Sequence, residues 1–147
     1  MKDIKANNKC VNTTGYKALY IIPLSEVLAV NFIDKQTKEV IFSKDGSFGK
    51  VDVFDIKIQS KYEDDAYKHQ ITSNFRSLVD ESVLFNSLSK NRFIVRVTDN
   101  NGNSYIYGSK SEPLRFSFDF VGNPKPSQTK EYQLTFYGET TFPAYSI

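Results

Sequence analysis

The clearest structural signal in this chain is the stretch Asn91-Arg92-Phe93-Ile94-Val95-Arg96-Val97-Thr98-Asp99-Asn100-Asn101-Gly102-Asn103-Ser104-Tyr105-Ile106-Tyr107. Side chains alternate between the two faces of an extended strand, so Phe93, Val95 and Val97 share one face. The Asn101-Gly102 pair supplies the positive φ values that a tight turn needs. These features predict a β-hairpin over residues 91–107 and indicate a β protein.

The same alternation predicts further strands on both sides of this hairpin. Strands are expected at 16–22, 25–32 and 38–43, which would form a meander, and at 114–120 and 132–136. A strand that starts near a β-bulge at Val53-Phe54 is expected to turn through a polar tip at 61–66 into a return strand at 67–75. The resulting long hairpin, 54–75, is predicted to protrude, because its arms exceed the usual strand length.

Two segments make specific predictions about the core. Residues 77–90 are the best helix candidate, with an apolar stripe and with acidic Asp80 and Glu81 near its positive end; the stripe consists of Val79, Val83, Leu84 and Leu88. In the strand at 114–120 the apolar residues all share one parity. Phe116, Phe118 and Phe120 are therefore predicted to be buried.

Length and composition bound the fold class. With 147 residues and no visible internal boundary, the chain is predicted to be one mainly β domain over 1–147, with extended segments at 1–14 and 140–147. We expect an antiparallel sandwich or partly closed barrel of about eight to ten strands with one helix. The lone Cys10 cannot pair within the chain, and the chain start lacks the apolar core of a signal peptide.

Charge and composition point to no particular class of ligand. The formal net charge of +2 is too small to indicate a nucleic-acid or membrane partner, and no apolar run is long enough to span a membrane. Twelve Phe and nine Tyr without Trp suit sheet faces and subunit contacts, and they suit sugar stacking less well.

No catalytic, cofactor or metal site is predicted. His69 is the single histidine, and the sequence contains no nucleophile-elbow motif for which it could act as the catalytic base. It is expected on the surface or half-buried. The run Glu63-Asp64-Asp65 and the loop at 99–102 are better interpreted as hairpin turns than as cation sites, and the glycine loop at 44–50 lacks phosphate-loop spacing. A scattered glycosidase pair stays open, with four glutamates available: Glu26, Glu112, Glu131 and Glu139.

Several segments together resemble a known class of proteins. They are Asn91 to Gly102, Tyr105-Ile106-Tyr107-Gly108, Glu112-Pro113-Leu114-Arg115-Phe116, Tyr132 to Gly138 and Pro143-Ala144, with a looser match at Ala66 to Gln70. The succession resembles small structural proteins of the tail or neck of tailed bacteriophages and of prophages of Bacteroides-type bacteria. The resemblance covers about half of the chain. It implies a virion component in which curled β domains form rings around the DNA channel.

We therefore expect a non-enzymatic virion protein, made in the host cytoplasm, that forms rings with itself through β edges and the long hairpin. The other expected partners are tail, neck and portal proteins, with non-specific proximity to DNA and no membrane contact. The interface is predicted to include Tyr62, Glu63, Asp64, Asp65, Phe142, Tyr145 and Ile147. An independent carbohydrate- or receptor-binding β-sandwich module is the alternative.

Overall fold

The computed structural model describes residues 3–4, 15–32, 38–42, 48–121 and 130–146. Within them the protein is mainly β, with one antiparallel sheet of nine strands, a separate two-stranded sheet and a single α-helix, as predicted. The main sheet consists of β1 (Tyr16–Pro23), β4 (Gly49–Val51), β5 (Phe54–Glu63), β6 (Ala66–Ser77), β7 (Arg92–Asp99), β8 (Ser104–Tyr107), β9 (Leu114–Phe120), β10 (Lys130–Thr140) and β11 (Tyr145–Ser146).

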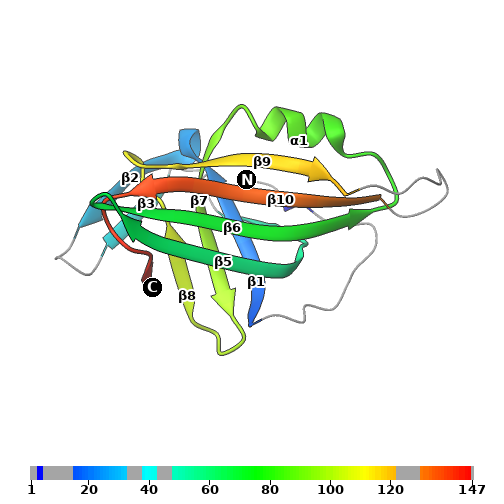
Figure 1. Cartoon of the computed structure of the whole chain (residues 1–147). Coiled ribbons are helices and arrows are strands. Elements are labelled where there is room, and N and C mark those ends of the chain that lie inside the picture. The colour runs from blue at the N-terminus through cyan, green and yellow to red at the C-terminus, as the bar shows by residue number, and fades with distance from the viewer. Residues whose placement is uncertain (1–2, 5–14, 33–37, 43–47, 122–129, 147) are drawn as a thin grey trace.

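The main sheet folds over itself into two layers. Strands β9, β10, β6 and β5 lie side by side in a long layer, and β8, β7, β1 and β4 form a second layer that crosses it (Figure 1). Strand β7 joins the layers, because its start pairs with β9 at Phe93↔Leu114 and its later part pairs with β8 and β1. The sheet does not close into a barrel, since β5 pairs only with β6 and β4 pairs only with β1 among the described strands.

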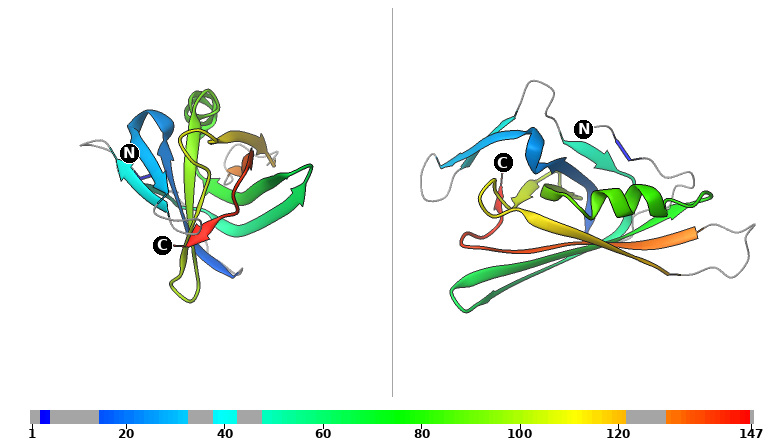
Figure 2. Two further views of the ribbon diagram at one scale, coloured as in Figure 1. Left: turned by 90° about the vertical axis from the view of Figure 1, so that its left-hand side faces the viewer. Right: turned by 90° about the horizontal axis from the view of Figure 1, so that it is seen from above.

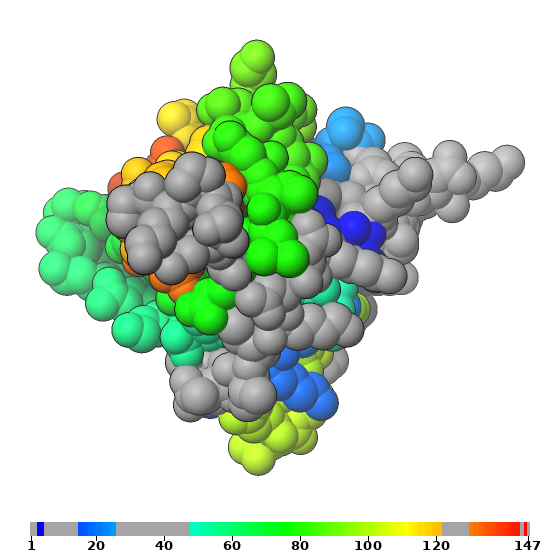
Figure 3. All heavy atoms as spheres, turned by 90° about the vertical axis from the view of Figure 1, so that its right-hand side faces the viewer, coloured from blue at the N-terminus to red at the C-terminus, as the bar shows by residue number. Residues whose placement is uncertain are grey.

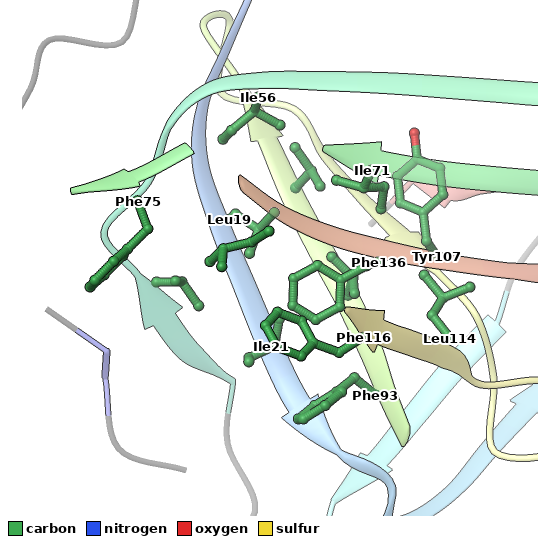
Figure 4. Close-up of a cluster of buried hydrophobic side chains, with 14 of the residues drawn as sticks. Leu19, Ile21, Ile56, Ile71, Phe75, Phe93, Tyr107, Leu114, Phe116 and Phe136 are labelled. Atoms are coloured by element: carbon green, nitrogen blue, oxygen red, sulfur yellow. The ribbon is translucent and has the colours of Figure 1, made fainter. Parts of the chain in front are cut away.

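The core fills the space between the two layers. Figure 4 shows side chains from both layers meeting there, among them Leu19 and Ile21 of β1, Phe93 of β7 and Phe136 of β10. Phe93 is fully buried, and its ring centroid lies 5.8 Å from that of Phe136. Fully burying such a side chain stabilises the fold by roughly 1.5–3 kcal/mol.

Both predicted hairpins form. In the β7–β8 turn, Gly102 has φ of 87°, and Oδ1 of Asp99 accepts the N–H groups of Asn101 and Asn103 at 2.9 Å. The β5–β6 hairpin turns at Asp64 and Asp65, which both have positive φ. The predicted bulge lies slightly further along, where the pairing of β5 with β6 is irregular between residues 54 and 57.

The helix prediction was wrong in extent and in buried face. Helix α1 spans Ser82–Leu88, because β6 continues to Ser77 and the chain then turns before the helix begins. Of the predicted stripe, Val79, Val83 and Leu84 are exposed and only Leu88 packs against the core. Phe85 is fully buried instead, and its ring meets Phe75 edge-on at 5.3 Å.

The predicted phenylalanine face of β9 is buried over only part of its length. Phe116 is buried, Phe118 is half-buried and Phe120 is 50% exposed. The three side chains lie on the same face of β9, as predicted. The second layer of the sheet, however, does not extend far enough along β9 to cover Phe120. The prediction that Phe120 lies in the core was wrong.

Pairing in the N-terminal part differs from the predicted meander. Strand β1 pairs with β4 and β7, while β2 (Val27–Phe32) pairs with β3 (Lys38–Phe42) in the separate small sheet. The 3-10 turn η1 (Leu24–Glu26) separates β1 from β2, and Gly49 and Lys50, predicted as loop, belong to β4. Of the predicted extended segment 1–14, the structure describes only Asp3 and Ile4, and Ile4 forms a β-bridge with Val51. Cys10 lies outside the described residues.

Candidate functional site

The closed end of the β5–β6 hairpin carries four of the seven predicted interface residues. Tyr62 is 61% exposed, and Glu63, Asp64 and Asp65 are exposed as well. The last five residues of β5 are all exposed, whichever face of the sheet they occupy, so no second layer covers this part of the strand. Figure 2 shows the closed end of the hairpin at the outer margin of the molecule.

The three acidic residues at the hairpin tip have separate partners. Glu63 Oε2 lies 3.1 Å from Nζ of Lys61, and Asp64 has its own lysine neighbour at 4.0 Å. Asp65 Oδ1 accepts a hydrogen bond from the hydroxyl of Tyr62 at 3.4 Å. Across the described residues, no group of three His, Cys, Asp or Glu side chains could hold a metal ion.

Strand β5 offers unpaired backbone groups along its outer edge. Its two-residue turn makes Glu63 and Ala66 a hydrogen-bonded pair, and bonded and non-bonded pairs alternate along an antiparallel ladder. Ser60 and Tyr62 therefore direct their backbone N–H and C=O away from β6. Such an edge is a template for a further strand.

His69 links three strands behind this projecting end. Its buried ring places Nδ1 2.8 Å from Oγ of Ser60 on β5 and Nε2 2.9 Å from Oγ1 of Thr140 on β10. The Thr140 hydroxyl donates to the carbonyl of Phe142, so it accepts from Nε2–H, and Nδ1 accepts the proton of Ser60. Where a hydrolase triad would have a carboxylate, this chain of bonds has a threonine hydroxyl.

The surroundings of His69 favour its neutral form. Burial lowers the pKa of His69, although a hydrogen bond with the backbone of Phe142 acts in the opposite direction. Tyr67 stacks on the ring at a centroid distance of 6.4 Å, and Tyr107 meets it edge-on at 5.2 Å. The expectation of a surface or half-buried histidine was wrong, because the side chains of Tyr107, Ser60 and Thr140 surround the ring.

The C-terminal segment folds back on its own sheet. Thr141 donates both its backbone N–H and its hydroxyl to the carboxylate of Glu112, and Ala144 packs against the core. Tyr145 starts strand β11 and pairs with Ile106 of β8. The tail is therefore more regular than its sequence predicted.

The remaining predicted interface residues fall in or after this segment. Phe142 is 39% exposed, Tyr145 is placed through its backbone in β11, and Ile147 lies outside the described residues. Thr140 pairs with Tyr67, which pairs in turn with Tyr62, so the tail and the hairpin tip lie at the same end of the long layer. We call this end the hairpin-end surface; its members are Tyr62, Glu63, Asp64, Asp65 and Phe142.

A surface of exposed apolar side chains lies at the opposite end of the long layer. There the ends of β6 and β9 flank the start of β10, and α1 contacts β9 (Figure 1). Figure 3 shows this end of the molecule as a surface, with the atoms around α1 in bright green. Exposed fractions reach 84% at Val83 and are near or above one half at the other members. We call this the helix-end surface; its members are Leu78, Val79, Val83, Phe120 and Val121.

A cavity of about 410 Å³ opens beside the β7–β8 turn and the start of β1. It is lined by Gly15, Tyr16, Asp99, Asn101, Tyr105 and Tyr107. Tyr107 is only 7% exposed, and burial together with the nearby Tyr16 and Tyr105 raises its pKa to about 12. Its hydroxyl therefore stays protonated across the physiological pH range.

Sequence reasoning did not find this tyrosine cavity. Tyr105 and Tyr107 alternate on one face of a short strand, which was a local signal. Tyr16 joins them only because β1 pairs with β7, where Tyr16 lies opposite Asp99. That pairing joins residues far apart in the chain.

Three of the four glutamates considered for a glycosidase pair contact other residues. Glu112 accepts from Thr141, Glu131 forms an ion pair with Arg76 at 2.9 Å, and Glu139 lies 3.9 Å from Nζ of Lys68. The side chain of Glu26 lies outside the described part of the structure.

None of the helices in the described ranges has the length and apolar character needed to cross a membrane. Comparison of the chain with protein-family models, with curated proteins and with solved structures found no match.

Proposed function

We propose that this chain is a non-enzymatic structural subunit that forms a closed ring with copies of itself in the tail or neck of a tailed bacteriophage. The virion assignment rests on the sequence resemblance. The assembly mode rests on one structural observation: two exposed surfaces lie at opposite ends of the same sheet layer, one mainly acidic with Tyr62 and Phe142, the other apolar.

A ring needs two different surfaces that fit each other. A head-to-tail contact joins unlike patches of neighbouring subunits, and it closes when the rotation between subunits permits. The hairpin-end and helix-end surfaces are separated by β6, whose twelve residues span roughly 40 Å. In the proposed contact, Tyr62 and Phe142 of one subunit pack against the helix-end surface of the next, because large exposed apolar side chains mark such contacts. The three acidic residues stay at the solvent-exposed margin, since burying unpaired carboxylates is costly.

The free edge of β5 adds backbone groups to the same contact. Ser60 and Tyr62 direct N–H and C=O groups outward, next to the exposed tip. A segment of the neighbouring subunit that lies along this edge would pair with them. In the proposed particle, the further partners are tail, neck and portal proteins, and the inner face of the ring lies close to DNA. The chain would be made in the host bacterial cytoplasm and would function in the virion.

The head-to-tail arrangement is tested by complementation between two variants. One carries Tyr62→Ser and Phe142→Ser at the hairpin-end surface, and the other carries Leu78→Ser and Val121→Ser at the helix-end surface. Each variant alone should be monomeric in analytical ultracentrifugation, whereas the wild type forms a closed oligomer. A mixture of the two should yield a heterodimer, because one intact pair of surfaces remains.

The outcomes separate the possible contacts. A heterodimer in the mixture, with two monomeric parents, supports head-to-tail association. A wild type that stays monomeric at high concentration, and also fails to join neighbours in a reconstituted particle, contradicts the proposal. Circular dichroism of each variant checks that the substitutions leave the sheet folded, as their exposure predicts.

The role of the β5 edge has a matched pair of variants. Ser60→Pro removes the outward N–H of β5, and Ser60→Ala keeps it; both remove the hydroxyl that contacts His69. If the edge pairs with a neighbour, only the proline variant should lose oligomer. If the two variants assemble equally well, the backbone of β5 does not take part in the subunit contact, and only side chains form it.

The alternative, a carbohydrate- or receptor-binding β-sandwich module, is favoured by a different observation. The tyrosine cavity combines aromatic rings with an acidic and an amide side chain. Binding of a glycan by the monomer, together with a failure of the wild type to assemble, would make this alternative the better proposal.

A further inference from the structure

We propose that the tyrosine cavity binds a neutral, hydroxyl-rich ligand, namely one sugar residue of a glycan. The cavity is lined by Gly15, Tyr16, Asp99, Asn101, Tyr105 and Tyr107 and has a volume of about 410 Å³, within the range of roughly 300–1,000 Å³ typical of small-ligand sites. The inference does not rest on ring assembly, since the cavity lies apart from both surfaces assigned to subunit contacts.

The first argument is an unpartnered polar group inside the cavity. The Tyr107 residue lines the cavity, and its hydroxyl forms no hydrogen bond with another described residue, so it is available to a ligand. Figure 4 shows this hydroxyl pointing away from the apolar cluster. A ligand that enters the cavity can therefore replace water as the hydrogen-bond partner of this hydroxyl.

The second argument is the position of the groups around it. Tyr105 and Tyr107 lie two residues apart on one face of β8, and Tyr16 is close enough to both to affect the ionisation of Tyr107. Asp99 is held by the N–H groups of Asn101 and Asn103 on its Oδ1, and no described residue donates to its second oxygen. Phenol hydroxyls, a carboxylate and an amide together offer both donors and acceptors, as a sugar requires.

The third argument concerns charge. Among the described residues that line the cavity there is no lysine or arginine, and the one charged group is the carboxylate of Asp99, which disfavours an anionic ligand. Tyrosines around a carboxylate can also hold an organic cation against their ring faces. A quaternary ammonium forms no hydrogen bond with the hydroxyl of Tyr107, whereas a sugar hydroxyl does, which favours the sugar.

The test uses the full-length chain and four neutral probes: D-glucose, D-galactose, D-mannose and N-acetyl-D-glucosamine. Saturation-transfer NMR identifies any probe that binds, and calorimetry measures its Kd. Tetramethylammonium chloride serves as the cationic probe. Tyr107→Phe and Tyr105→Phe remove single hydroxyls from the cavity, and Tyr137→Phe, on an exposed tyrosine of β10 outside it, is the matched control.

We expect at least one sugar to bind in the millimolar range, and Tyr107→Phe to weaken it about three- to tenfold, as the loss of one hydrogen bond predicts. Tyr137→Phe should leave the Kd unchanged. Tyr107→Phe should not lower the melting temperature, because it removes only a hydroxyl without a partner. Asp99→Asn keeps an oxygen that accepts the turn N–H groups but removes the negative charge. It should therefore lower the affinity for a sugar far less than it would lower the affinity for a cation.

Three results would overturn the inference. None of the four sugars binds the wild type, or Tyr107→Phe leaves sugar affinity unchanged, or tetramethylammonium binds where the sugars do not. The ring-assembly proposal is tested with variants of the hairpin-end and helix-end surfaces, and none of the members of these surfaces lines the cavity. Failure of one proposal is therefore distinguishable from failure of the other.

Discussion

The two long hairpins of this protein have the same local design and opposite surroundings. Both have alternating side chains and a turn with positive φ. Strand β7 lies between β1 on one side and β8 and β9 on the other, and four of its eight residues are buried while none is exposed. Strand β5 has one neighbour, β6, and its last five residues are exposed.

The comparison shows that strand order determines what a hairpin does. A central strand has all its backbone groups paired and contributes to the core, whereas an edge strand keeps one row of N–H and C=O groups for a partner. In this protein the stable part and the part available for contacts are therefore built from the same kind of sequence.

The largest expected difference concerns side-chain truncation. Phe93→Ala in β7 should lower the free energy of unfolding by roughly 3–5 kcal/mol, because it empties a fully buried site between Phe116 and Phe136. Tyr62→Ala in β5 should change it by less than about 0.5 kcal/mol. Urea unfolding of the monomer measures both, and similar losses in the two variants would contradict the assigned strand order.

A smaller effect is expected at His69, the buried anchor of the exposed hairpin. His69→Gln should cost about 1–3 kcal/mol at neutral pH, since the bonds to Ser60 and Thr140 are disturbed. The lowered pKa means that the unfolded chain binds a proton that the folded chain does not. The stabilisation by neutral His69 is fully present at pH values above 6.5, the pKa of histidine in the unfolded chain. It is lost as the pH falls from 6.5 towards the lower pKa of His69 in the folded protein.

The measurement is the difference in unfolding free energy between wild type and His69→Gln at several pH values from 8 to about 5. Carboxylates titrate in both proteins, so their contribution cancels in the difference. The gap should narrow as the solution becomes more acidic. A gap that widens instead would show that the folded state prefers the charged imidazole.

The two turns should respond in opposite directions to substitution. Gly102→Ala should destabilise the β7–β8 hairpin by about 1–2 kcal/mol, because φ is 87° there. No atom lies within 4 Å of the added Cβ, so the loss reflects backbone strain alone. Thermal unfolding measures it, and an unchanged midpoint would show that the turn adapts freely.

The smallest effect is expected at the other turn. Asp65 has φ of 60°, and glycine is favoured at that position of a tight hairpin turn. Asp65→Gly should stabilise the protein by a few tenths to about 1 kcal/mol. Asp65→Asn, which removes the charge at the same position and keeps a side chain there, is the matched control. If Asp65→Gly lowers the melting temperature, the bond from Tyr62 to Asp65 matters more than the backbone conformation.

Local patterns in the sequence were sufficient to predict most of the strands and both hairpin turns. The alternation at 91–107 and at 114–120 and the turn residues gave hairpins and strands close to those observed, because strand period and positive φ are properties of a few neighbouring residues. The same alternation misplaced Phe120. Parity says which face a side chain occupies, but the covering layer ends before that residue.

By itself the sequence determined the β class, the two hairpins and the position of their turns. Only the tertiary structure decided that β1 pairs with β7 and not with its sequence neighbour β2, that His69 is bonded to Thr140, and that Tyr16 joins Tyr105 and Tyr107 around one cavity. These contacts join residues far apart in the chain. Their formation depends on which strand edges and apolar faces remain uncovered once the local elements have formed, and no short stretch of sequence contains that information.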